Sequence, residues 1–230
     1  MSLFLYSCDK NESENKYSPG IYIGDFSLND GVSNIVTALV SKSSEMRFPL
    51  SGGHVKVENI NNFPDSSVVL EVYQDLDTPL FKKHNSSLIF TDNPNFVGDI
   101  TGSWTSEDRM QSGILSLSKS SKPEVSQSLV TDSYNWILQF GSSGGTSIRV
   151  NITTNPSGII NGNDDLGCVY SGNFDPQSGI EGVYSVTVDI SSCGSHNGSY
   201  SGITAIDPIH DSLFILVSNE IKSITLQMNR

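Results

Sequence analysis

Apolar and polar residues alternate with a period of two along much of this 230-residue chain, a pattern typical of β-strands with one buried face. Residues 54–58 and 146–153 alternate clearly, and residues 214–217 are apolar on both faces, as in a central strand. The clearest run is 183–190, whose apolar side chains would share one face: Tyr184, Val186, Val188 and Ile190. The first half of the chain shows no convincing helical period of 3.6 residues.

Turn-forming residues separate these runs at short intervals and predict hairpins. Asn29-Asp30-Gly31 would join a strand at 20–26 to a return strand at 34–40, because these residues tolerate positive φ. Further strands are expected at 68–73, 113–118, 127–132, 134–140 and 221–230. This spacing predicts an all-β fold, an antiparallel meander that closes into a barrel or sandwich and is lipocalin-like in general architecture.

A tyrosine two residues before a glycine recurs in three of the predicted strands. The pairs are Tyr22 and Gly24, Tyr170 and Gly172, and Tyr200 and Gly202. Residues two apart on a strand share a face, so the ring and the bare glycine would lie on the same side. We interpret the pairs as structural, at a sharp strand bend or beneath a neighbour's large side chain, rather than as ligand-stacking sites.

The strand pattern weakens between residues 74 and 95, where charged residues and prolines surround one short apolar run. We therefore expect three parts: residues 1–17 as a leader and polar tether, 18–95 as an N-terminal β section and 96–230 as a C-terminal β section. The two β sections could also form one continuous domain, because a β-rich chain of this length fits either arrangement.

Charge narrows the classes of partner. The chain has 25 acidic and 13 basic side chains and a formal net charge of −12. Nucleic acid is a poor candidate, because binding to phosphates depends on Lys and Arg. An acidic surface instead suits a cationic partner. No segment approaches the roughly 18 apolar residues that a transmembrane helix needs.

The first eight residues resemble the end of a bacterial lipoprotein signal peptide. In that resemblance Leu5 and Ser7 occupy lipobox positions, and Cys8 becomes the lipidated first residue of the mature protein. The apolar run is shorter than a signal core and no basic residue precedes it, so we expect a trimmed sequence or a misplaced start codon. The alternative is a frayed N-terminus in which Cys8 is incidental.

If Cys8 carries a lipid, Cys168 and Cys193 remain as a pair 25 positions apart. We predict that they form a disulfide, which in an oxidising compartment would stabilise the fold by roughly 3 kcal/mol. Two buried thiols are the alternative. A zinc site is disfavoured, because the chain has no CxxC motif and His196 is the only nearby nitrogen ligand.

No motif for catalysis or for a cofactor is present. The histidines are scattered, without HExxH, and the glycine-serine run at residues 141–145 is interpreted as a flexible turn. They are His54, His84, His196 and His210. Residues 161–165 suggest a calcium loop, but Leu166 stands where such a loop needs glycine. We assign no catalytic, cofactor-binding or metal-binding residue.

From residue 98 onward, the order of aromatic, glycine and cysteine positions resembles a group of uncharacterised bacterial envelope lipoproteins. The residues that carry the resemblance are Trp104, Cys168, Tyr170, Gly172, Tyr184, Cys193, Tyr200 and Gly202. The resemblance implies a barrel-like body in the bacterial cell envelope, facing the periplasm or the surface and held at the membrane through a lipid on Cys8. It implies no activity.

The hypothesis that follows is a membrane-anchored, non-enzymatic binding or structural module. Its candidate partners are a small apolar ligand inside a barrel and a cationic protein such as lysozyme. The alternative is an envelope hydrolase acting on glycan or ester substrates. That enzyme would need convergent carboxylates, or a serine beside a histidine.

Overall fold

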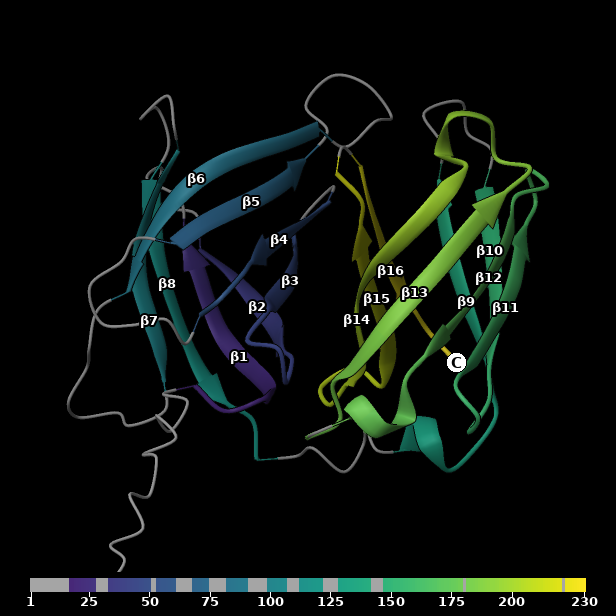
Figure 1. The fold of residues 1–230 in the computed structure, drawn as a ribbon, viewed down its shortest axis with the longest axis horizontal. Coiled ribbons are helices and arrows are strands. Elements are labelled where there is room, and N and C mark those ends of the chain that lie inside the picture. Colours follow the sequence, from purple (N-terminus) through teal and green to yellow (C-terminus); the bar gives the residue numbers. More distant parts are fainter. Residues whose placement is uncertain are drawn as a thin grey trace, which may run out of the picture.

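The computed structural model consists of two antiparallel β-sheets that stand side by side, each following the order of the chain (Figure 1). It describes residues 17–27, 33–50, 53–60, 68–74, 82–90, 99–106, 112–121, 128–141, 147–179, 181–220 and 222–230. The predicted all-β, antiparallel, barrel-like architecture is confirmed. No helix among these residues is long and apolar enough to cross a membrane.

The first sheet is a closed barrel of eight strands, because β1 pairs with β8 as well as with β2. Its strands are β1 (Gly20–Ser27), β2 (Ser33–Val40), β3 (Met46–Leu50), β4 (Gly53–Val57), β5 (Val68–Gln74), β6 (Lys82–Phe90), β7 (Ile100–Ser106) and β8 (Ser112–Lys119). The predicted hairpin around residues 29–31 is the β1–β2 pair, with Gly20 opposite Val40 and Ser27 opposite Ser33.

The second sheet also has eight strands, and its edges, β9 and β16, meet only through a bridge between Ile137 and Asn229. Its strands are β9 (Tyr134–Gly141), β10 (Ser147–Thr154), β11 (Ile159–Asp164), β12 (Val169–Phe174), β13 (Tyr184–Ser191), β14 (Gly198–Asp207), β15 (Ser212–Ser218) and β16 (Ser223–Met228). It is a nearly closed barrel, and we call it the second barrel.

Three short 3-10 helices complete the described structure: η1 (Ser128–Val130), η2 (Pro176–Ser178) and η3 (Gly194–His196). The strand predicted at 127–132 is wrong, since its described centre is η1. Leu129 of η1 is buried in the core of the second barrel. An apolar residue with polar neighbours satisfies a strand pattern and a single helical turn equally well.

The chain passes from one barrel to the other between Lys119 and Tyr134. The boundary predicted at 95/96 therefore falls between β6 and β7, two paired strands of the first barrel. A polar segment between two strands looks the same in a sequence whether the strands belong to one sheet or to two. The point where the chain leaves the first barrel depends on how many strands are needed to close that barrel. Local composition does not show this number.

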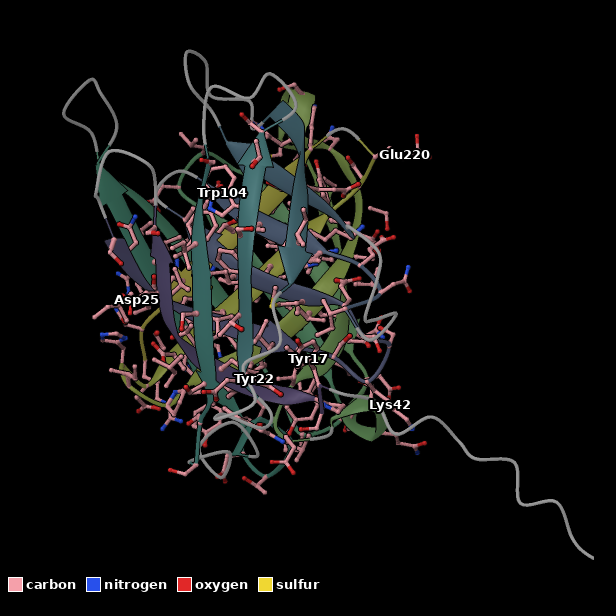
Figure 2. All side chains as sticks on the ribbon, turned by 90° about the vertical axis from the view of Figure 1, so that its left-hand side faces the viewer. Tyr17, Tyr22, Asp25, Lys42, Trp104 and Glu220 are labelled. Carbon is pink, nitrogen blue, oxygen red and sulfur yellow. A yellow bond between two sulfur atoms is a disulfide. The ribbon has the colours of Figure 1, made fainter. Side chains whose placement is uncertain are left out.

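Each barrel has its own apolar core. In the first, Trp104 stacks on Phe26 with ring centroids 5.1 Å apart, and Phe26 also meets Phe48 at 5.2 Å. Figure 2, which looks onto this barrel, shows Trp104 and Tyr22 towards its opposite ends. In the second barrel, β13 alternates strictly between buried and exposed residues, as its sequence predicted.

The two barrels are joined by a third apolar cluster, between β1 and β2 on one side and β14, β15 and Val183, the residue before β13, on the other. It consists of Ile21, Leu39, Val183, Ile203, Ala205, Phe214 and Leu216. All seven are buried, and they point outward from their own barrels, because Tyr22 and Ile215 beside them lie in the barrel cores. The apolar character of both faces of β15 therefore reflects contact with the first barrel.

The glycines of the repeated signature lie where the strands crowd one another. A Cβ atom at Gly24, Gly172 or Gly202 would lie 2.0 to 2.1 Å from a backbone carbonyl oxygen of the adjacent strand. No other residue fits such a position without moving the neighbouring strand. The glycines therefore allow the adjacent strands to approach closely, which is a structural role.

Tyr22 and Tyr200 of the signature are buried and donate hydrogen bonds to the backbone just before their own strands. The hydroxyl of Tyr22 donates to the carbonyl of Ser18 at 2.9 Å, and that of Tyr200 donates to the carbonyl of His196 at 2.9 Å. Burial raises the pKa of both phenols, so the hydroxyls keep their protons and remain donors. Both side chains therefore act as structural anchors.

Candidate functional site

A groove of about 530 Å³ runs between the barrels, where β3, β4 and β5 approach β14, β15 and the turn before β16. Its charged lining comprises Glu45, Arg47, Lys56, Glu58, Glu71 and Glu220. Ser199, Tyr200, Ser201, Ser218 and Asn219 complete the wall. We call it the interbarrel groove. The strands that form it lie at the centre of Figure 1.

Arg47 is the buried centre of this groove, with only 2% of its side chain exposed. Its Nε donates to Glu45 Oε1 at 2.5 Å, and its Nη1 donates across the interface to Ser218 Oγ at 3.0 Å. A Cβ atom at Gly202 would lie 3.0 Å from the guanidinium carbon. The first barrel thus inserts a cation against a bare position of the second barrel.

His54 makes a second polar contact between the barrels and is fully buried. Its Nε2 lies 3.2 Å from Arg47 Nη1, and its Nδ1 lies 2.9 Å from Thr225 Oγ1 on β16. Because a guanidinium can only donate, Nε2 must be the acceptor and the proton of the neutral ring sits on Nδ1. Burial, together with the charges of Arg47 and Lys56, holds the pKa of His54 well below its usual value.

Lys56 lies opposite Arg47 in the β3–β4 pair and is held within the first barrel. Its Nζ is 2.5 Å from Glu58 Oε1 and 3.6 Å from Glu71 Oε2. Burial lowers the pKa of Lys56, but the hydrogen bond to Glu58 and the charge of Glu71 outweigh it, so the pKa is raised. Lys56 therefore stays a cation, paired with carboxylates of its own barrel.

The groove as a whole carries an acidic excess. Four glutamates line it against two cations, Arg47 and Lys56. Glu58, 58% exposed, and the exposed Glu220 stand on opposite barrels, so negative charge borders the groove on both sides. Such an arrangement favours a positively charged group in the groove, because walls of low dielectric concentrate the field between them.

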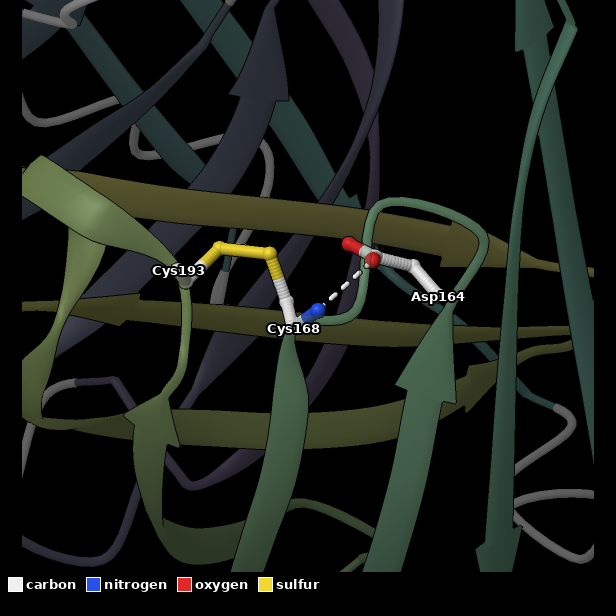
Figure 3. A group of neighbouring side chains, drawn as sticks. All are labelled: Asp164, Cys168 and Cys193. Carbon is white, nitrogen blue, oxygen red and sulfur yellow. Dashed lines mark hydrogen bonds between the residues drawn. A yellow bond between two sulfur atoms is a disulfide. The ribbon is translucent and has the colours of Figure 1, made fainter.

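The predicted disulfide is present: Cys168 and Cys193 are bonded at 1.95 Å, with 4.5 Å between their Cα atoms (Figure 3). It joins the ends of β12 and β13, since Val169 pairs with Ser191. Asp164 lies beside it and accepts hydrogen bonds from the amides of Leu166 and Cys168, both at 2.9 Å.

Asp164, Cys168 and Cys193 are close enough together to suggest a metal site. The two sulfur atoms are bonded to each other, however, and a cysteine binds a metal ion as a thiolate. Asp164 Oδ2 also accepts a hydrogen bond from the Tyr170 hydroxyl at 3.0 Å, and burial, together with this carboxylate, raises the pKa of Tyr170. These residues therefore stabilise the turn between β11 and β12.

His54 and His210 both take part in contacts that hold the fold together. His54 touches a hydroxyl, but it is buried and its Nε2 accepts from Arg47, so it cannot serve as the base that activates that hydroxyl. His210 Nδ1 lies 2.6 Å from Asp207 Oδ2, and Asp207 Oδ1 accepts from the amide of Ile209 at 2.9 Å. That pair closes the turn between β14 and β15. Of His84 only the backbone is described.

The sequence pointed to Cys168 and Cys193 but missed Arg47, His54 and the groove. Arg47 and His54 stand at polar positions of strands in which apolar and polar residues alternate. Such polar positions normally face solvent. The available signal was indirect: β15 is apolar on both faces, so something must cover the outside of its barrel. Cys8, the predicted lipidation site, lies outside the described residues.

No family model matches the chain, and neither curated proteins nor solved structures show a significant match to it.

Proposed function

We propose that this chain is a membrane-anchored lipoprotein of the bacterial envelope that acts as a non-enzymatic binding module, and that the interbarrel groove receives a cationic segment of a partner protein. The observation that carries the binding proposal is the acidic excess of the groove, with Glu58 and Glu220 on its two sides. The net charge of −12 would steer a cationic partner towards it.

The groove is a better binding place than the inside of either barrel. Tyr184, Val186 and Val188 pack together in the core of the second barrel, and the three aromatic rings of Phe26, Phe48 and Trp104 pack in the first. A small apolar ligand would have to displace these side chains. A positively charged segment in the groove would displace only water.

The envelope location is supported by three features. Leu5, Ser7 and Cys8 form a lipobox-like start, and residues 10–16 are polar enough to act as a tether. The Cys168–Cys193 bridge suits an oxidising compartment. Metabolic labelling of the natural full-length product with palmitate tests the anchor: label lost in a Cys8→Ser variant supports it, and an unlabelled wild type refutes it.

Lysozyme is a suitable cationic probe for the groove. Glu58→Gln combined with Glu220→Gln should weaken lysozyme binding about tenfold at low salt, because each rim charge contributes up to about 1 kcal/mol. The matched control is Asp25→Asn with Asp189→Asn, which also removes two negative charges but from exposed strand positions outside the groove. Equal weakening by both pairs would mean that binding is non-specific, and no retention of the wild type at low salt would end the proposal.

A further inference from the structure

The contact between the barrels has an apolar side and a polar side, and on the polar side the ring of His54 links the two barrels. Away from the groove, Thr37 Oγ1 donates to Asp207 Oδ1 at 3.5 Å and Lys119 pairs with Glu181 at 3.9 Å across the same contact. The apolar cluster joins β1 and β2 to β14, β15 and the residue before β13. Beside the groove, Arg47 bonds to Ser218 and His54 bonds to Thr225. His54 is therefore part of the joint beside the groove, and a proton on its ring would change that joint directly.

The hydrogen-bond directions make His54 intolerant of a proton in this position. Arg47 Nη1 donates to Nε2 of His54, so a proton on Nε2 would turn an acceptor into a second donor. It would also place an imidazolium 3.2 Å from a guanidinium in a buried contact. Two cations at this distance repel each other strongly when they are buried away from water.

The charged groups around His54 come from three neighbouring strands and one turn. Arg47 on β3 and Lys56 on β4 are cations, and Glu71 on β5 pairs with Lys56. Glu45, just before β3, pairs with Arg47. The partners on β15 and β16, Ser218 and Thr225, are uncharged hydroxyls. Glu71 and Glu45 are thus each paired with a cation.

We propose that His54 is a proton-sensitive latch: in its neutral form it joins the two barrels beside the groove, and a proton on its ring breaks that joint so that the groove side opens about the apolar cluster. The latch is a property of the fold and stands whether or not a partner binds in the groove.

The direction of the pH response follows from proton uptake. The latched form keeps His54 neutral, whereas in the open form water reaches the ring and its pKa returns towards about 6.5. The open form therefore binds more protons below that pH. The ratio of open to latched molecules should rise about tenfold for each pH unit below 6.5 and stay constant above it.

Spin labels on the two sides of the groove test this directly. The labelled protein is the full chain with Cys8→Ser, Glu58→Cys and Glu220→Cys, and the label separation is measured by pulsed electron paramagnetic resonance from pH 8 to pH 4.5. We expect a longer distance to gain population below pH 6.5. His54→Gln in the same background should abolish the change, because the amide can accept from Arg47 and donate to Thr225 without titrating.

His210→Gln is the histidine control: it removes a 63% exposed ring that bonds to Asp207, the acceptor of Thr37 across the contact, and that lies in the β14–β15 turn rather than beside the groove. It should leave the transition intact. A transition that survives in His54→Gln, or that disappears in His210→Gln, overturns the proposal, and so does a label distance that stays constant to pH 4.5.

Nitrogen-15 spectra of the histidine rings in the otherwise unchanged protein give an independent check that needs no His54 variant to fold. At pH 7 one ring should be the neutral Nδ1–H tautomer, and its protonation should coincide with groove opening. A His54 ring that is an Nε2–H tautomer, or that titrates near pH 6.5 without a change in label distance, refutes the latch.

Discussion

Replacing Arg47 by methionine should weaken the fold far more than a surface charge change would. Methionine keeps much of the side-chain volume but removes every hydrogen bond. Ser218, 5% exposed, and His54, fully buried, would each lose a partner that water cannot replace. An unsatisfied buried polar group costs about 1–3 kcal/mol, so we expect the free energy of unfolding to fall by about 3 kcal/mol.

The control for this change is Lys56→Met, in the same groove and opposite Arg47 in register. Lys56 pairs with Glu58 and Glu71 of its own barrel and has no bond to the second barrel among the contacts described, so its loss should cost less, about 1–2 kcal/mol. Urea unfolding followed by circular dichroism measures both variants. The reasoning about the buried contact is refuted if Arg47→Met costs no more than Lys56→Met.

A double-mutant cycle separates the interbarrel bond from the rest of the arginine's environment. Arg47→Met and Ser218→Ala should show a coupling energy of about 1–2 kcal/mol, because their groups bond at 3.0 Å across the interface. A coupling near zero would mean that Arg47 stabilises only the first barrel.

Two further predictions concern the second barrel. Removing the disulfide by Cys168→Ala with Cys193→Ala should lower the free energy of unfolding by about 3 kcal/mol, since the bridge closes a loop of 25 residues; an unchanged urea midpoint would contradict a stabilising role. Gly202→Ala should cost about 1–3 kcal/mol, because its methyl group would lie 2.0 Å from the Leu216 carbonyl oxygen. The neighbouring, exposed Ser201→Ala should change thermal stability little, so equal effects at the two positions would rule out the crowding argument.

Much of the fold could be predicted from the sequence because alternation and turn chemistry act locally. The strand at 183–190 and the β1–β2 hairpin were predicted in this way and are present. The Cys168–Cys193 bridge was predicted from the number of cysteines and is present too. The number of barrels could not be predicted, because closure depends on pairing between β1 and β8, which are about 90 residues apart in the chain.

The candidate site was hidden for a different reason. Arg47 and His54 occupy outward positions of the first barrel, and a sequence pattern separates inside from outside within one sheet only. Whether an outward position faces water or another barrel depends on tertiary packing. Outward apolar residues such as Leu39 and Phe214 carry a local trace of that packing, and they mark the apolar side of the contact rather than the groove.

The two sides of the contact differ enough in strength to set how far a proton can act. Seven apolar side chains are buried in the cluster between the barrels, and each buried side chain of this kind stabilises by about 1.5–3 kcal/mol at most. Keeping His54 neutral two pH units below its ordinary pKa destabilises the closed contact by about 2.7 kcal/mol. The proton therefore cannot separate the barrels completely. It suffices to break the polar side, where each hydrogen bond contributes about 1 kcal/mol net, so the response belongs to the interbarrel groove and to whatever binds there.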